Sequence, residues 1–168
     1  PTGHEVRQPV RGRVNIVRTA ATLLGQPIPR LEDGAEVAVD WKLFFHAFPK
    51  HSVVLWFGDF PPRSPGAGWA ALKKRYEIIG VRVDDPWDLE LPSAGILPAV
   101  DPETGEVMAF DTGTFESQSR HDAWKQEREQ AWEEWFPSPL QRLTVGTEGD
   151  LLDPMVAFFK RRMKGVRR

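Results

Sequence analysis

The chain has 168 residues and a mass of 19.1 kDa, and 40% of its residues are hydrophobic and 27% charged. This composition is that of a globular protein and excludes a wholly disordered chain. The absence of cysteine excludes disulfides, thiolate metal sites and a cysteine nucleophile. The net charge of −2 is uneven, because residues 160–168 contain six of the 22 basic residues and no acidic one. An acidic body with a basic end is a poor match for DNA or RNA, so no nucleic-acid partner is expected.

The length suits a single domain over residues 1–168, with residues 160–168 as a basic tail. No apolar run reaches the roughly 18–20 residues that cross a bilayer, and the polar start is unlike a signal peptide. The lack of cysteine fits a reducing compartment, so we predict a cytoplasmic location without a direct membrane span. The four histidines lack the spacing of a zinc motif.

The first fifty residues predict helices. Residues 11–24 place apolar side chains at helical spacing, and Gly25 followed by Pro27 predicts where this amphipathic helix ends. Residues 36–48 fit two patterns, because their apolar side chains alternate as in a strand and also recur at the spacing of a helix. We favour the helix, for a reason given with the family resemblance below.

A strand, a short helix and a second strand come next. Residues 52–57 (SVVLWF) form a continuous apolar run, which is typical of a strand covered on both faces in a parallel sheet. Residues 69–76 predict a short helix, and residues 77–83 (EIIGVRV) predict a second buried strand. Strand, helix and strand at this spacing indicate a βαβ unit with a right-handed crossover.

A β-hairpin and a long helix follow this unit. Residues 96–101 and 106–112 flank a Pro-Glu-Thr-Gly turn, which predicts a hairpin. Thr114 then caps a helix that runs to about Phe136. The apolar stripe of this helix is predicted to consist of Trp124, Ala131, Trp132 and Trp135.

The chain closes with a strand and a helix. Residues 140–145 predict a short third strand, and Asp153-Pro154 predicts the start of the last helix. The buried face of that helix is predicted to consist of Leu152, Met155, Val156, Phe159 and Met163. The order of all these elements predicts an α/β fold, a Rossmann-like three-layer sandwich with an inserted hairpin.

Ligand sites in such sheets lie beyond the carboxyl ends of the strands. Asp59 follows the first predicted strand, and Asp84 and Asp85 follow the second. Oxygen ligands of this kind suit Mg²⁺, whereas aspartates in loops also cap helices and turns. Both interpretations remain open from the spacing. No nucleophile elbow or phosphate-binding loop accompanies the three aspartates.

The seven tryptophans divide into two groups. Trp56 and Trp124 lie on apolar faces, which predicts that they fill the core. Trp87 lies between acidic residues in a proline-flanked loop, where an exposed indole could anchor a protein partner. Packing of Trp87 over the edge of the sheet is the alternative.

Several segments together resemble one bacterial family. These are VVLWFGDF, the stretch DDPWDLELPSAG followed by DPETGE, and GDLLDPMVAFFKRR near the end. The chain resembles the domain-of-unknown-function-58 family over about residues 10–163. The resemblance implies a fold similar to a von Willebrand factor A domain. It also implies a non-enzymatic role as a partner of MoxR-type AAA ATPases in chaperone or assembly systems.

Domains that resemble von Willebrand factor A can bind Mg²⁺ at a metal-ion-dependent adhesion site built from three loops. Asp59 in Gly58-Asp59-Phe60 matches the third loop. The chain has no DxSxS sequence for the first loop, and residues 34–37 have no threonine for the second. The resemblance therefore implies a degenerate site, with no metal and no cofactor. It also places a helix after the second loop, which is why we read residues 36–48 as a helix.

The missing DxSxS loop implies that a central strand is absent as well. The chain then corresponds to a partial von Willebrand factor A domain that lacks its N-terminal half. An apolar strand at residues 52–57 belongs inside a sheet, so we expect that the chain does not stand alone as a monomer. Its exposed edge would be covered by the missing half, by a second copy, or by the helix at residues 11–24.

We predict that the chain is a protein–protein interaction domain and an adaptor for a MoxR-type AAA ATPase, and that it is not an enzyme. Asp59, Asp85 and Trp87 are the predicted partner-binding residues. The alternative is a Mg²⁺-dependent phosphohydrolase that uses Asp59, Asp84 and Asp85. The basic tail is predicted either to favour the negative end of the last helix dipole or to contact an acidic partner or membrane surface.

Overall fold

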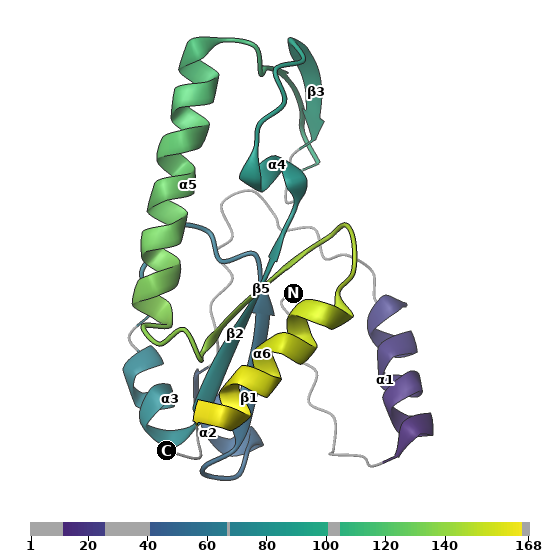
Figure 1. The fold of residues 1–168 in the computed structure, drawn as a ribbon, viewed down its shortest axis with the longest axis vertical. Helices are drawn as coiled ribbons and strands as arrows, with labels where there is room; N and C mark the ends of the chain where they lie inside the picture. Colours follow the sequence, from purple (N-terminus) through teal and green to yellow (C-terminus); the bar gives the residue numbers. More distant parts are fainter. Residues whose placement is uncertain (1–11, 26–40, 67, 101–104, 166–168) are drawn as a thin grey trace. The chain divides into compact units, whose positions relative to one another are not determined.

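The computed structural model describes residues 12–25, 41–66, 68–100 and 105–165 (Figure 1). They belong to two compact units, the first comprising residues 1–47 and 98–109 and the second residues 48–97 and 110–168. The α/β class predicted from the sequence is confirmed. Within the described residues, no helix is both long and apolar enough to cross a membrane.

The described part of the first unit includes two helices. α1 (Arg13–Leu24) begins after Gly12, whose φ of 95° suits glycine. It ends at Gly25, whose N–H donates to the oxygen of Ala21. The predicted helix is confirmed, although none of its residues is buried. α2 (Trp41–Ala47) confirms the helical interpretation of its segment, while residues 36–40 lie outside the described residues.

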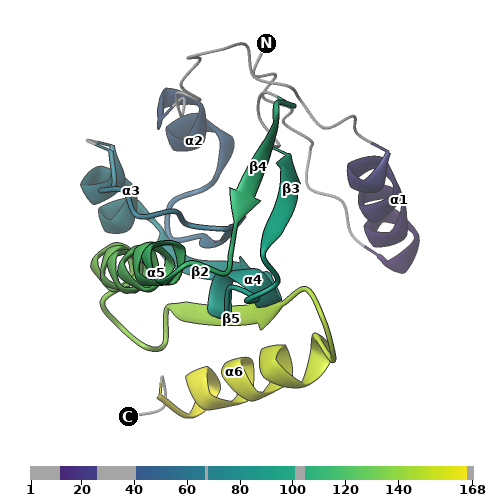
Figure 2. The same cartoon turned by 90° about the horizontal axis from the view of Figure 1, so that it is seen from above.

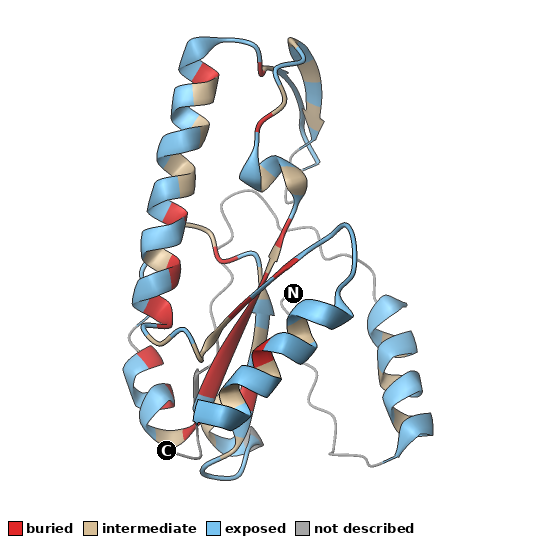
Figure 3. Cartoon of the chain, in the orientation of Figure 1, coloured by how far each residue is buried: buried red, intermediate tan, exposed pale blue. Residues whose placement is uncertain are grey.

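The second unit is built on a parallel three-stranded sheet. Its strands are β1 (Val53–Gly58), β2 (Glu77–Asp84) and β5 (Arg142–Gly146), in the spatial order β1-β2-β5. Both neighbouring pairs run parallel, which confirms the three predicted strands and their βαβ connection. β2 is the central strand, and it is buried along almost its whole length (Figure 3).

Four helices belong to this second unit: α3 (Trp69–Arg75), α4 (Pro86–Leu89), α5 (Phe115–Trp135) and α6 (Leu152–Gly165). Thr114 caps α5 as predicted, because its hydroxyl oxygen accepts from the N–H of Ser117 at 3.1 Å. The predicted hairpin is also confirmed. Its strands β3 (Ile96–Val100) and β4 (Val107–Asp111) form a separate two-stranded sheet, whose turn at residues 101–104 lies outside the described residues.

One face of the main sheet is covered by aromatic rings around Gly80. Trp132 and Phe136, at the end of α5, pack with their ring centroids 4.7 Å apart. A Cβ added at Gly80 would lie 2.4 Å from atoms of both rings, so only glycine allows α5 this close to β2. The cluster is completed by Phe60, Trp69 and Trp135. Trp56, predicted to be in the core, lies half-buried at its rim against Trp69 and Trp135.

The opposite face is covered by α6, which runs beside β5 (Figure 2). Phe158 is the buried residue of α6, and it packs on side chains of β2 and β5, namely Ile79, Val81, Leu143 and Val145. The predicted buried face of α6 is therefore partly wrong. Met155 and Phe159 are partly buried, but Val156 is exposed, and Leu152 and Met163 are more than 60% exposed.

Arg162 explains this rotation of α6. Its guanidinium group donates to the main-chain oxygen of Leu140 and forms an ion pair with Glu77, which holds Phe158 toward the sheet. α6 also continues to Gly165, so the predicted basic tail is wrong for residues 160–165, which form the last turns of this helix. Residues 166–168 lie outside the described residues.

β1 is covered on only one face, contrary to the sequence prediction. Val54 is buried, whereas Val53, Leu55 and Phe57 are exposed. The reason is the position of β1 at the edge of the sheet, since α6 packs over β2 and β5. Residues that alternate along a strand point to opposite faces, so a helix missing from one face exposes every second side chain.

We expect Gly80→Ala to lower the free energy of unfolding by about 1–3 kcal/mol, because the added methyl group overlaps rings that cannot easily move. Urea denaturation followed by circular dichroism measures this loss. Gly58→Ala is the matched control, since its Cβ would meet ring atoms of Phe60 at an ordinary 3.6 Å. Equal stability of Gly80→Ala and the wild type would contradict the packing described here.

Candidate functional site

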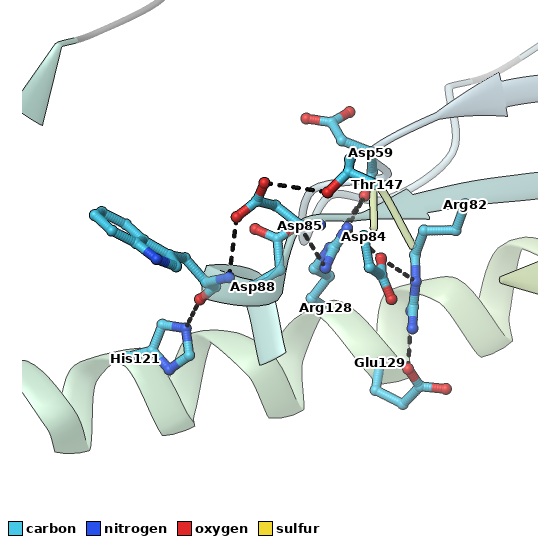
Figure 4. A network of polar contacts seen from close by, with 10 residues as sticks. Asp59, Arg82, Asp84, Asp85, Asp88, His121, Arg128, Glu129 and Thr147 are labelled. Carbon is cyan, nitrogen blue, oxygen red and sulfur yellow. Dashed lines mark hydrogen bonds and ion pairs between the residues drawn. The ribbon is translucent and has the colours of Figure 1, made fainter. Parts of the chain in front are cut away.

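The carboxyl ends of the three parallel strands meet at one edge of the sheet. Asp59 follows β1, Asp84 ends β2, and Thr147 follows β5 (Figure 4). The N–H of Thr147 donates to the main-chain oxygen of Asp84 at 2.9 Å, which joins two of these strand ends. The sequence correctly predicted that Asp59, Asp84 and Asp85 come from neighbouring strand ends, but their side chains have three different environments.

Asp84 is buried between two arginines. Its side chain is only 3% exposed, and its Oδ1 lies 2.9 Å from a guanidinium nitrogen of Arg128 and 3.0 Å from Nε of Arg82. Its other oxygen, Oδ2, makes no hydrogen bond with the described protein atoms. Both arginines are themselves nearly buried. Burial of a carboxylate is costly unless it is paired, so this arrangement gives Asp84 a structural role.

Arg128 connects α5 to two strand ends. Its Nε and Nη2 donate to the main-chain oxygen of Asp59 at 3.0 and 2.5 Å, while Nη2 also donates to Asp84. Its guanidinium carbon lies 5.2 Å from the ring centroid of Trp124, within the range of a cation–π contact. The sequence had predicted that Trp124 fills the core, and this is wrong. Trp124 is half-buried, and its ring packs against Arg128 and His121.

Arg82 makes the second connection to α5. Its Nη1 donates to Oε2 of Glu129 at 2.8 Å, and its guanidinium carbon lies 5.4 Å from the ring centroid of Trp132. The loops at this edge are therefore held by a charged network that includes residues of β2 and α5 (Figure 4).

Asp85 is the N-cap of α4. Its side chain accepts from the N–H of Trp87 at 3.0 Å, and its own N–H donates to the side chain of Asp88 at 2.9 Å. These two bonds form a capping box. The hydroxyl of Thr147 also lies 3.4 Å from Asp85. Asp85 nevertheless remains exposed, as does the side chain of Asp59.

Trp87 is 54% exposed and lies on the short helix α4, where the sequence had predicted a loop. The helix beneath it is fixed to α5, because Nε2 of His121 lies 2.8 Å from the main-chain oxygen of Trp87 and Lys125 donates to that of Leu89 at 3.0 Å. Of the two interpretations of Trp87, the exposed indole agrees with the structure. The short helix α4 presents it on a fixed backbone.

A pocket of about 440 Å³ opens beside α5. Leu91, Phe110 and Trp124 supply its apolar side chains. His121 also lines it, and this is the residue that contacts the main chain at Trp87. His121 is therefore common to the pocket and to the contact that holds α4, the helix that carries the exposed Trp87.

The sequence analysis did not identify the two arginines. Arg128 is four residues from both Trp124 and Trp132, so it falls on the predicted apolar stripe of the helix, where a charge requires a buried partner. The position of Arg128 on this stripe was the feature of the sequence from which its burial could have been predicted. Arg82 pairs with Asp84 two residues further along β2, but its partner on α5, Glu129, is nearly fifty residues away along the chain and could not be inferred from a local pattern.

We expect Arg128→Met to lower the free energy of unfolding by about 3 kcal/mol, since it leaves a buried carboxylate with one cationic partner instead of two. Arg120→Met is the matched control on the same helix, because its ion pair with Glu116 is exposed and worth at most about 1 kcal/mol. Urea titrations of both variants measure the difference. A loss of the same size in both variants would contradict a structural role for Arg128.

We also expect that the chain does not bind Mg²⁺ tightly. Asp84 is paired with arginines and Asp85 caps a helix, which leaves the exposed Asp59 carboxylate with mostly water to complete the coordination of an ion. Thermal melts with and without millimolar Mg²⁺ should coincide. A rise of several degrees that Asp59→Ala abolishes would contradict this prediction and support the hydrolase alternative.

The comparison with known proteins gives one match. A family model described as "Protein of unknown function DUF58" matches residues 3–133. No curated protein and no solved structure matches the chain. The match covers most of the chain, and it includes β1, β2, the hairpin and most of α5 with Arg128. The resemblance inferred from the sequence is therefore confirmed, and the chain belongs to the DUF58 family.

Proposed function

We propose that this chain is a non-enzymatic protein–protein interaction domain that acts as an adaptor for a MoxR-type AAA ATPase. The observation that carries the proposal is the exposed indole of Trp87 on a short helix whose backbone is fixed to α5. Exposed aromatic side chains on rigid supports are favoured anchors in protein interfaces, because little conformational entropy is lost when they bind.

The partner surface in this proposal comprises Trp87, Asp85 and Asp59. All three are exposed: Asp59 lies in the loop after β1, Asp85 is the N-cap of α4, and Trp87 lies on α4. Asp85, two residues before Trp87, and Asp59 at the neighbouring strand end add negative charge to this surface, which favours a basic patch on the partner. The pocket lined by Leu91, Phe110 and Trp124 supplies a place for an apolar side chain of the same partner.

The same proposal extends to the fold. A parallel sheet with helices on both faces supports a partial von Willebrand factor A-like domain, in which β1 takes the place of the strand that precedes the third metal-site loop. The alternative of a Mg²⁺-dependent phosphohydrolase is not favoured, because Asp84 is already paired with Arg82 and Arg128.

We expect Trp87→Ala to weaken the binding of a purified MoxR-type AAA ATPase by at least about tenfold, as for a central interface residue. Biolayer interferometry with the immobilised chain measures the affinity. Asp59→Ser and Asp85→Ser should weaken binding less and reduce its dependence on salt.

Phe115→Ala is the control for this experiment, because Phe115 is a large, exposed apolar residue at the start of α5 that is not part of the proposed partner surface. An affinity that Trp87→Ala and Phe115→Ala change equally would contradict the proposed surface. Failure of the wild-type chain to bind any MoxR-type ATPase would contradict the adaptor role.

A further inference from the structure

The segment between the end of β2 and the start of β3 is held at both of its ends. At its start, Asp84 belongs to the buried ion network and Asp85 is the N-cap of α4. At its end, the N–H and the hydroxyl of Thr112, which is buried, both donate to the main-chain oxygen of Gly95 at 2.9 Å. Residues 86–93, which we call the strap, lie between these two attachments.

The strap has little packing of its own. Leu91 is the one buried residue among residues 86–93, whereas Trp87, Leu89 and Glu90 are exposed. α4 is a single turn, and a helix this short is not stable by itself in water. The last main-chain oxygens of a helix also have no partner within it. The conformation of the strap therefore depends on the groups that it contacts outside α4.

α5 supplies these groups from one of its sides. The donors follow one another at intervals of three or four residues, which places them on one side of the helix: Gln118, His121 and Lys125. Nε2 of His121 lies 2.8 Å from the main-chain oxygen of Trp87 (Figure 4). Lys125 donates to the main-chain oxygen of Leu89 at 3.0 Å. Gln118 donates to that of Leu91 at 3.2 Å. Because a carbonyl oxygen can only accept, Nε2 of His121 carries the proton in its contact.

The strap also forms part of the wall of the apolar pocket. Leu91 lines the pocket from the strap, while His121 and Trp124 line it from α5. The rings of His121 and Trp124 lie with their centroids 5.7 Å apart. A movement of the strap away from α5 would therefore change the position of Trp87 and the shape of the pocket together.

We propose that His121 and Lys125 are positioning residues that hold the strap closed on α5, and that the strap opens as one unit when they release it. Its attachment to α5 consists mainly of hydrogen bonds to the main chain, and segments with few buried apolar contacts open locally without global unfolding. The aromatic core of the second unit lies around Gly80, at the other end of α5, and opening of the strap leaves it intact. The consequence for binding rests on the proposed function, in which the closed strap presents Trp87 and the pocket to the partner.

Hydrogen exchange followed by mass spectrometry tests the proposal on the free chain. The reporters are the N–H groups of Asp88 and Glu90, which are hydrogen-bonded within α4 and its cap. We expect His121→Ala combined with Lys125→Ala to speed exchange in the strap by about tenfold or more, because two hydrogen bonds that hold it are lost. Exchange in β2 should not change.

Two further variants separate the role of the donors from that of packing. His121→Gln combined with Lys125→Arg keeps an N–H donor at each position and should restore slow exchange, although it removes the contact between the rings of His121 and Trp124. Arg120→Ala combined with Gln126→Ala is the matched control, because these exposed residues of α5 form no hydrogen bond with the strap. This control should leave exchange in the strap unchanged.

Three results would overturn the proposal. They are unchanged exchange in the strap of the His121→Ala, Lys125→Ala variant, a rise of the same size throughout the chain, and fast exchange in the variant that keeps both donors. The proposed function is measured separately, because a purified MoxR-type AAA ATPase should slow exchange in the strap of the wild type. An ATPase that binds without slowing it would contradict the proposed partner surface, whereas the positioning roles of His121 and Lys125 are decided on the free chain.

Discussion

The buried carboxylate of Asp84 is the constraint on which the second unit depends. A charge at the end of the central strand cannot be buried without cationic partners, and Arg82 and Arg128 supply them. Arg128 is on α5 and also binds the main-chain oxygen of Asp59. The pairing of Asp84 therefore holds both α5 and the loop after β1 against the end of β2. The exposed residues of the candidate site thus lie on loops held by a buried ion network.

A second requirement acts at the other end of α5. Most residues of α5 are polar, so this helix packs against the sheet through a few large side chains, which include Trp132 and Trp135. These rings reach β2 because Gly80 has no side chain to oppose them. A glycine inside a strand normally weakens it. Here the loss is offset by close aromatic packing, so an apparently unfavourable residue determines where α5 lies.

These two attachments have different consequences for function. The aromatic end of α5 is buried, and it contributes stability. The charged end supports α4 and the loops, where Trp87 and the carboxylates of Asp59 and Asp85 reach solvent. Val53, Leu55 and Phe57 on β1 are also exposed, and their side chains are all apolar.

The sequence by itself determined the elements and the family. Apolar spacing, the Thr114 cap and the turn residues are local signals, so the three strands, the hairpin and the helices other than α4 were predicted close to their bounds. The tertiary structure alone decided which faces of those elements are buried. Phe158 became the contact of α6 because Arg162 binds Leu140 and Glu77, and β1 has one open face because α6 packs over the other two strands. From the sequence, Asp84 was a candidate metal ligand. In the structure it is paired with Arg128, which lies more than forty residues away along the chain. Burial and ion pairing depend on neighbours that are distant in the sequence, which no local pattern records.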